Sequence, residues 1–320
     1  MKPFIGAVVQ TASVAFDPDR TVEKLGDYAA KAASGGAKLV VFPEAFVGGY
    51  PKGLDFGARV GSRTAAGRES FRVYHDGAID VPGPQAARVG EIAAANAVHL
   101  VTGVIERDQG TLYCTVLFFA PDGTLLGKHR KLMPTAAERL VWGFGDGSTL
   151  PAFGTPLGKL GAVICWENYM PMLRMAMYAK GVSLYCAPTA DDRETWGATM
   201  RHIALEGRCF VFSACQLTRR SDYPADYPID GNPPPDTILM RGGSCIVGPL
   251  GQMLAERVFD QDAVLTAEID PGEVVRGKYD FDATGHYARP DVFRLLVNEK
   301  AQPAVQTNAP AVFGLQDDPS

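Results

Sequence analysis

Short apolar runs alternate with amphipathic segments along most of the chain. Several of these runs have the length and composition of buried β-strands, and they cover residues 4–9, 38–42, 98–105, 161–164, 182–187 and 209–215. Between them, apolar residues recur at helical spacing near residues 22–32, 86–93, 170–180 and 194–207. Glycines follow two of these segments, at Gly35-Gly36 and at Gly181, where a helix is expected to end.

The pattern also predicts antiparallel elements. Residues 112–120 and 124–129 flank Pro121-Asp122-Gly123, which is a typical hairpin turn. Three further strands are expected at residues 243–248, 252–257 and 263–269. Because hairpins are mixed with alternating strands and helices, the pattern favours an α/β layered sandwich with mixed sheets over a purely parallel barrel.

In three stretches of the chain, the hydrophobic positions show no clear periodicity. Residues 51–82 are polar, and we expect them to run over the surface with few core positions. Residues 218–240 are rich in proline and are expected to form a long loop, serving as a lid or a subunit contact. Residues after about 286 resemble an extended tail, which would be ordered only by packing on another part of the assembly.

Composition narrows the class of protein. A chain of 320 residues with 46% hydrophobic content can bury a sizeable core, and no low-complexity linker divides it. A net charge of −5 without a Lys/Arg run argues against nucleic acid as a partner. No apolar run reaches the length of a bilayer span, the N-terminus lacks signal-peptide features, and none of the cysteines forms a CxxC pair. We therefore expect a cytoplasmic protein with reduced cysteines and no membrane partner.

Candidate chemistry lies just past three predicted strands, at Glu44, Lys131 and Cys165. A thiol attacks as the thiolate, a carboxylate can take its proton and later activate water, and an ammonium can stabilise developing negative charge. The set is complete for covalent hydrolysis at an electrophilic carbon. Position alone leaves ordinary alternatives open, namely an inert buried thiol, a solvated carboxylate and a surface ammonium.

Around these residues the chain resembles the nitrilase branch of the carbon–nitrogen hydrolase superfamily. The resemblance rests on residues 41–46 (Val-Phe-Pro-Glu-Ala-Phe), 129–135 (His-Arg-Lys-Leu-Met-Pro-Thr) and 165–168 (Cys-Trp-Glu-Asn), in this order. Further similar segments are residues 136–139, 143–148 and 187–191, and the likeness extends from about residue 4 to about residue 295. The sequences of these segments resemble plant-type and bacterial nitrilases more than amidases or carbamoylases.

The resemblance implies a four-layer αββα sandwich as a single domain over residues 1–286, with a tail over residues 287–320 that forms an assembly contact or is partly disordered. It implies a homodimer, and family members often extend into spirals or filaments. It also implies a reaction without metal or organic cofactor, in which a nitrile and water give a carboxylic acid and ammonia. In that reaction Cys165 is the nucleophile, Glu44 moves protons, Lys131 stabilises charge, and Glu138 positions Lys131 and the substrate.

Substrate-binding candidates lie near the motif segments. Tyr50, Trp166, Thr189 and Trp196 could line a pocket, and aromatic walls suit aromatic or arylaliphatic nitriles. Ordinary packing is an equal alternative for each, and it is favoured for Trp196 because this residue recurs with apolar neighbours at helical spacing.

Two further residues, His129 and Glu167, lie close to the reactive ones in sequence. His129 is expected to be structural, and Glu167 to support the site from beside Cys165 without reacting. Other possible functions are hydrolysis of amides or N-carbamoyl groups with the same three residues, processing of cyanide, and a non-catalytic filament-forming role. The intact Glu44, Lys131 and Cys165 argue against the last of these.

Overall fold

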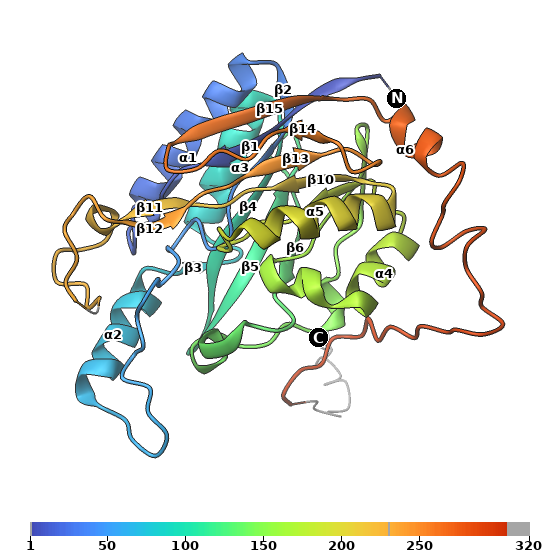
Figure 1. Ribbon diagram of the computed structural model, residues 1–320. Helices are drawn as coiled ribbons and strands as arrows, with labels where there is room; N and C mark the ends of the chain where they lie inside the picture. Colours follow the sequence, from blue (N-terminus) through green and yellow to red (C-terminus); the bar gives the residue numbers. More distant parts are fainter. Residues whose placement is uncertain (1, 230, 306–320) are drawn as a thin grey trace, which may run out of the picture.

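Two β-sheets lie face to face in the computed structural model, which describes residues 2–229 and 231–305 (Figure 1). Helices α1 (Pro18–Ser34) and α3 (Pro84–Asn96) cover the outer face of the first sheet. Helices α4 (Pro171–Ala179) and α5 (Glu194–Gly207) cover the second. The predicted four-layer αββα sandwich is thereby confirmed.

The first sheet has the strand order β15-β1-β2-β4-β5-β6, with β3 paired to β4. Its strands are β1 (Phe4–Gln10), β2 (Ala37–Val41), β3 (Ile79–Asp80), β4 (His99–Asp108), β5 (Thr111–Phe119), β6 (Leu125–Arg130) and β15 (Ala263–Ile269). β1, β2 and β4 are parallel because α1 and α3 return the chain to the same edge. β5 and β6 form the predicted antiparallel hairpin.

The second sheet repeats this construction. Its order is β14-β13-β10-β9-β8-β7, and β8, β9 and β10 are parallel, joined through α4 and α5. The strands are β7 (Phe153–Thr155), β8 (Gly158–Ala162), β9 (Leu184–Cys186), β10 (Phe210–Ser213), β13 (Cys245–Val247) and β14 (Met253–Ala255). The sheet is therefore mixed, as the sequence predicts.

Apolar side chains fill the three interfaces between the layers. One cluster, which includes Val8, Phe118 and Phe212, lies between the sheets, and the other two lie between each sheet and its helices. Burying one such side chain stabilises the fold by about 1.5–3 kcal/mol. The near-continuous apolar runs of the central strands follow from this arrangement, because both faces of each sheet are covered.

The expectation of few core positions in residues 51–82 is confirmed, because Tyr74, Ala78 and Ile79 are its only buried apolar side chains, but the helix within the stretch was not predicted. This stretch contains α2 (Ala65–Asp76), which begins where the Thr64 side chain accepts the N–H of Gly67. Tyr74 on α2 is fully buried and donates its hydroxyl to the carbonyl of Gly49 at 3.2 Å. One large aromatic residue anchors this helix to the core, and such an anchor leaves little periodic signal.

The predicted long loop over residues 218–240 is confirmed for residues 223–229 and 231–237, but the two ends of the segment are not loop. β11 (Leu217–Arg219) and β12 (Ile238–Arg241) pair as a small antiparallel sheet at its two ends. Between them, a 3₁₀ helix (Arg220–Asp222) follows β11 directly. The segment is therefore a long excursion closed by paired strands.

The tail runs along the outside of the molecule after α6 (Gly272–Gly277) (Figure 1). Residues 287–305 form no helix or strand, and they are held by contacts such as the ion pair of Glu299 with Lys180 at 2.8 Å. The backbone N–H of Gln302 donates to Asp146 at 2.7 Å. The rest of the predicted tail, residues 306–320, lies outside the described residues. No helix within the described ranges is long and apolar enough to cross a membrane.

Candidate active site

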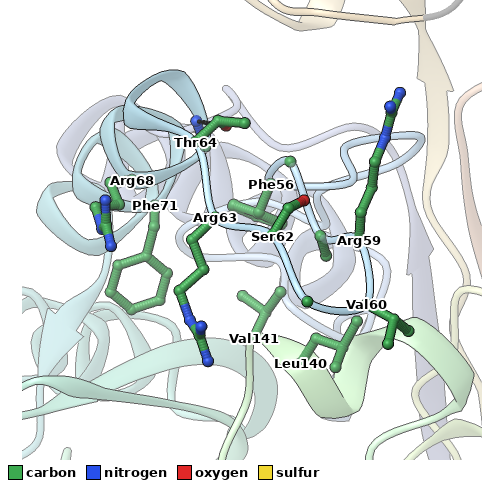
Figure 2. A pocket seen from close by; sticks show the side chains of 14 residues that line it. Phe56, Arg59, Val60, Ser62, Arg63, Thr64, Arg68, Phe71, Leu140 and Val141 are labelled. Carbon is green, nitrogen blue, oxygen red and sulfur yellow. Dashed lines mark hydrogen bonds between the residues drawn. The ribbon is translucent and has the colours of Figure 1, made fainter.

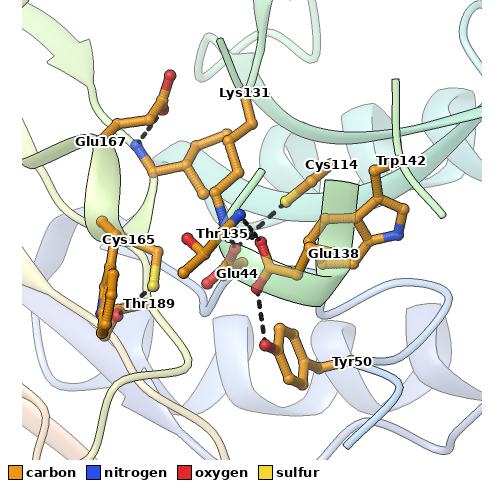
Figure 3. Close-up of polar contacts among 12 residues, drawn as sticks. Glu44, Tyr50, Cys114, Lys131, Thr135, Glu138, Trp142, Cys165, Glu167 and Thr189 are labelled. Carbon is orange, nitrogen blue, oxygen red and sulfur yellow. Dashed lines mark hydrogen bonds and ion pairs between the residues drawn. The ribbon is translucent and has the colours of Figure 1, made fainter. Parts of the chain in front are cut away.

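The three reactive residues come from both sheets and meet in one place. Glu44 follows β2, Lys131 follows β6 directly, and Cys165 follows β8 as the first residue of the 3₁₀ helix η3 (Cys165–Tyr169). Figure 3 shows that their side chains point toward one another. All three are buried, so the strand-end positions inferred from the sequence converge on an enclosed site.

Lys131 lies between two carboxylates. Its Nζ donates to Glu44 Oε1 at 2.7 Å and to Glu138 Oε2 at 2.8 Å. Trp142 lies over the same ammonium, with 5.4 Å from Nζ to the ring centroid. A buried ammonium requires such partners because its desolvation is otherwise costly.

Glu138 is held by groups around it. It lies in the 3₁₀ helix η1 (Ala136–Leu140), and its Oε2 also accepts the N–H of Thr135 at 2.6 Å. The hydroxyl of Tyr50 donates to Glu138 Oε1 at 2.7 Å (Figure 3). Both oxygens are therefore occupied, which fixes the carboxylate against Lys131.

Cys165 sits in a strained backbone conformation. Its φ of 49° is in the left-handed region, which is uncommon for a residue with a side chain and is often found at functional sites. Its N–H donates to the carbonyl of Pro188 at 2.8 Å, and the hydroxyl of Thr189 donates to its Sγ at 3.1 Å. The next N–H, that of Trp166, lies in the first turn of η3, where helix geometry provides no acceptor.

Burial and charge set the protonation of the site. Burial, assisted by the charge of Glu44, raises the pKa of the Cys165 thiol well above its ordinary range. Burial also raises the pKa of Glu44, although Lys131 opposes this. Burial alone would lower the pKa of Lys131, but Glu44 and the other acidic groups outweigh it and raise this pKa. The resting site therefore holds a protonated thiol, a charged ammonium and a carboxylate of increased basicity.

The two oxygens of Glu44 differ in their surroundings. Oε1 accepts from Lys131 and, at 3.5 Å, from the thiol of Cys114, whereas Oε2 is buried with no hydrogen-bond partner among the described residues. The side-chain amide of Gln216 donates to the Glu44 carbonyl at 2.9 Å. Oε2 is thus the atom available to accept a proton.

Gly103 on β4 allows the backbone of Glu44 to lie where it does. A Cβ at this position would be 2.4 Å from the carbonyl oxygen of Pro43 and 2.7 Å from the Cα of Glu44. The N–H of Gly103 also donates to that Pro43 carbonyl at 3.0 Å. Gly103, Cys114, Trp142 and Gln216 also belong to the site, although they were not predicted from the sequence.

The four predicted substrate residues fall into different environments. Tyr50 and Thr189 contact site residues, as described above. Trp166 is 40% exposed, and its indole N–H donates to Asp191 at 2.8 Å beneath the guanidinium of Arg193. Trp196 is fully buried in the cluster between the second sheet and its helices, where its indole donates to Ser213. The structure therefore assigns Trp196 to packing rather than to a substrate wall.

A separate cavity of about 570 Å³ lies beside this site, between residues 56–71 and η1 (Figure 2). Phe56, Phe71 and Val141 form apolar parts of its lining, and Arg63 extends beside Val141. Cys165, Lys131 and Glu44 do not line it.

Within the described ranges, no group of three or more His, Cys, Asp or Glu side chains is arranged to hold a metal ion. All six cysteines are free and buried. Cys165 differs from the other five in its left-handed backbone conformation.

The layered fold and the Cys–Glu–Lys arrangement are those expected of a hydrolase with a cysteine nucleophile. The family model described as carbon-nitrogen hydrolase matches residues 7–279, which is most of the chain. The chain therefore belongs to the carbon–nitrogen hydrolase family, as its sequence motifs indicate.

Relatives and a solved structure support this assignment. The chain is 59% identical to a nitrilase of Bradyrhizobium diazoefficiens, over 94% of each protein. It is 56% identical to an aliphatic nitrilase of Sinorhizobium fredii, covering 97% of this chain and 100% of the relative. A carbon-nitrogen hydrolase from Helicobacter pylori has the same fold, with a TM-score of 0.71 at 21% identity, covering 91% of this chain and 97% of the other.

Proposed function

We propose that this protein is a nitrilase, which hydrolyses an organic nitrile to the carboxylic acid and ammonia. The observation that carries the proposal is the buried Glu44–Lys131 ion pair beside the thiol of Cys165. The identity to two nitrilases over almost the full chain supports nitriles as the substrate class.

The first step is attack of Cys165 Sγ on the nitrile carbon. Glu44 Oε2, which has no other partner among the described residues, takes the thiol proton and delivers it to the nitrile nitrogen. A C–S bond forms, one C–N π bond breaks, and the product is a thioimidate. Lys131 and the N–H of Trp166 stabilise the negative charge that develops on nitrogen, and such a donor lowers the barrier by about 3 kcal/mol.

The second half of the reaction, in which the thioimidate is hydrolysed, uses two water molecules. Glu44 deprotonates the first, which adds to the thioimidate carbon, and the tetrahedral intermediate expels ammonia to leave a thioester. A second water cleaves the thioester, which releases the acid and restores the thiol. The balance is one nitrile and two waters to one acid and one ammonia. The hydroxyl of Thr189, 3.1 Å from Sγ, stabilises the sulfur as the leaving group.

We favour Trp166 as the side chain that forms a wall of the substrate pocket. It directly follows the nucleophile, and its indole is partly exposed and held by the hydrogen bond to Asp191. Tyr50 and Glu138 act on Lys131 from the opposite side. Arylaliphatic and aliphatic nitriles should both bind against such a wall.

Ammonia release from a panel of nitriles and their matched amides tests this function. Nitriles should be hydrolysed and their amides should not, Cys165→Ala should release no ammonia, and a chelator should leave the rate unchanged. Rapid turnover of amides or N-carbamoyl compounds alone would instead assign the amidase alternative, which would use the same residues. A preference for hydrogen cyanide over all larger nitriles would identify a cyanide-processing enzyme.

We also propose that the protein acts as a homo-oligomer in the cytoplasm. Tyr287, Phe293 and Leu296 in the tail expose most of their apolar surface, and a second copy could cover them. Sedimentation of the full chain and of a chain that ends at residue 286 tests this expectation. A monomeric full chain would contradict it.

A further inference from the structure

The carboxylate of Glu167 is fully buried two residues after the nucleophile, but it is not directed at the reacting atoms. Its Oε1 accepts the backbone N–H of Leu132 at 2.6 Å, and its Oε2 accepts the backbone N–H of Ile164 at 2.8 Å. The side chain of Glu167 is 0% exposed. A carboxylate with two short charge-assisted hydrogen bonds is rigidly held.

These two N–H groups belong to the segments that carry the reactive side chains. Leu132 directly follows Lys131, and Ile164 directly precedes Cys165. The first segment continues β6 of one sheet, and the second continues β8 of the other. Glu167 therefore joins the two sheets at the point where the ammonium and the sulfur must be aligned (Figure 3).

His129 contacts Glu167 from a third direction. The imidazole is fully buried, with Nδ1 at 3.0 Å from the carbonyl of Thr149 and Nε2 at 3.1 Å from Glu167 Oε2. A carbonyl can only accept, so Nδ1 carries a proton. The imidazole thus contacts the same carboxylate oxygen that accepts the Ile164 N–H, which adds a third partner to Glu167.

We propose that Glu167 is a positioning residue, which sets the separation of Cys165 and Lys131 by accepting one backbone N–H from each of their segments. The inference deepens the proposed nitrilase function and rests on it for the kinetic readout. It also explains why a glutamate stands in the Cys-Trp-Glu-Asn segment without contacting the reacting atoms.

Glu167→Gln tests the role of the two acceptors while preserving size. An amide has one oxygen and one NH₂ group, so either the Leu132 or the Ile164 N–H must face a donor. We expect kcat to fall by about 100-fold and KM to stay within about threefold, because a shift of about 1 Å in alignment affects the transition state more than binding.

Glu106→Gln is the matched control. Glu106 is also buried and lies beside β6, but its partners are the side chains of Thr115, Lys128 and Arg130. This variant should lose stability and keep kcat. A loss of kcat in both variants would assign Glu167 a general structural role and overturn the proposal.

A second readout does not depend on turnover. The rate at which iodoacetamide alkylates Cys165, followed against pH by mass spectrometry of its peptide, reports the alignment of the sulfur with Glu44 and Lys131. Glu167→Gln should slow it by about tenfold at neutral pH, whereas Glu106→Gln should match the wild type. If the wild type fails on nitriles but shows this dependence, the nitrilase function is wrong and the positioning role stands.

Hydrogen exchange of the wild-type protein covers the case in which Glu167→Gln does not fold. The amides of Leu132 and Ile164 should exchange far more slowly than exposed loop amides. Fast exchange at both would overturn the proposal, as would Glu167→Gln with wild-type kcat and alkylation rate.

Discussion

Lys131 Nζ lies 2.7 Å from Glu44 Oε1, and neither side chain is exposed to solvent. An ammonium and a carboxylate at this distance would be a weak source of stability, because their desolvation offsets most of their attraction. Their arrangement is better explained by the reaction, in which Glu44 must accept a proton and Lys131 must stay charged.

Removing the nucleophile should abolish activity without unfolding the protein. Cys165→Ala deletes only a sulfur and relieves no packing beyond it, although alanine must still adopt the positive φ of 49°. Ammonia release should be undetectable, and circular dichroism and sedimentation should match the wild type. Cys186→Ala, which removes another fully buried thiol, is the control and should retain activity. Ammonia release by Cys165→Ala would show that another group attacks the substrate.

Tyr50→Phe removes the hydroxyl that donates to Glu138 Oε1 at 2.7 Å. Glu138 then loses one of its three donors and holds Lys131 less firmly. A hydrogen bond to a charged group contributes about 1.5–3 kcal/mol, so we expect kcat/KM to fall by roughly 10-fold to 100-fold. Steady-state kinetics check this result, and Tyr28→Phe on α1 serves as the control. Unchanged kinetics would exclude Tyr50 from the support of Glu138.

Gly103→Ala should disable the site by displacing the backbone of Glu44. The new Cβ would overlap backbone atoms of Pro43 and Glu44, which cannot move without shifting the carboxylate. We expect a loss of kcat of about 100-fold, with a folded protein. Gly110→Ala, at a position where a Cβ meets no atom within 4 Å, should behave as wild type. Full activity of Gly103→Ala would show that the Glu44 segment adapts.

As the pH is lowered, kcat/KM should fall at a higher pH than it would if the base were a glutamate with an ordinary pKa. Burial raises the pKa of Glu44 above its usual value of 4.5, and protonation of Glu44 removes the base that takes the thiol proton. The acid limb of kcat/KM should therefore lie above pH 4.5. A pH–rate profile on a neutral nitrile measures this, and a limb at or below 4.5 would contradict the base assignment.

Glu106→Gln should destabilise the protein in a pH-dependent manner. Arg130 and Lys128 bind Glu106 and lower its pKa in spite of its burial. A lowered folded-state pKa means that the stabilisation is complete above the unfolded pKa and is lost as the pH falls through the folded pKa. We expect the variant to lose about 3 kcal/mol at neutral pH and less below pH 4.5, as measured by urea unfolding.

Much of the sandwich could be predicted from sequence because its strands are buried on both faces. The runs that become β1, β2 and β10 are nearly all apolar, and such runs can be recognised from the sequence alone. Helix α2 was not predicted because Tyr74 is its only fully buried apolar side chain. One aromatic anchor produces no periodic pattern.

The reactive residues of the site could be predicted because two independent signals indicate them. Glu44, Lys131 and Cys165 lie in the family motifs, and each follows a predicted strand. Their supporting contacts depend on register and on close approach of the backbone. Cys114 could have been found from the predicted hairpin, since Thr115 pairs with Arg130 and therefore places Cys114 opposite Lys131. Gln216, which is distant in sequence from Glu44, left no such local signal.

The excess of acidic groups around Lys131 has a consequence for the departure of product. Two carboxylates flank one ammonium, so the ionised trio has a net charge of −1. A nitrile enters without charge, but the acid formed from it ionises and then faces Glu44 and Glu138 across a poorly screened space. Repulsion should expel the anion and keep accumulated acid from occupying the enzyme, so inhibition by product should be weak.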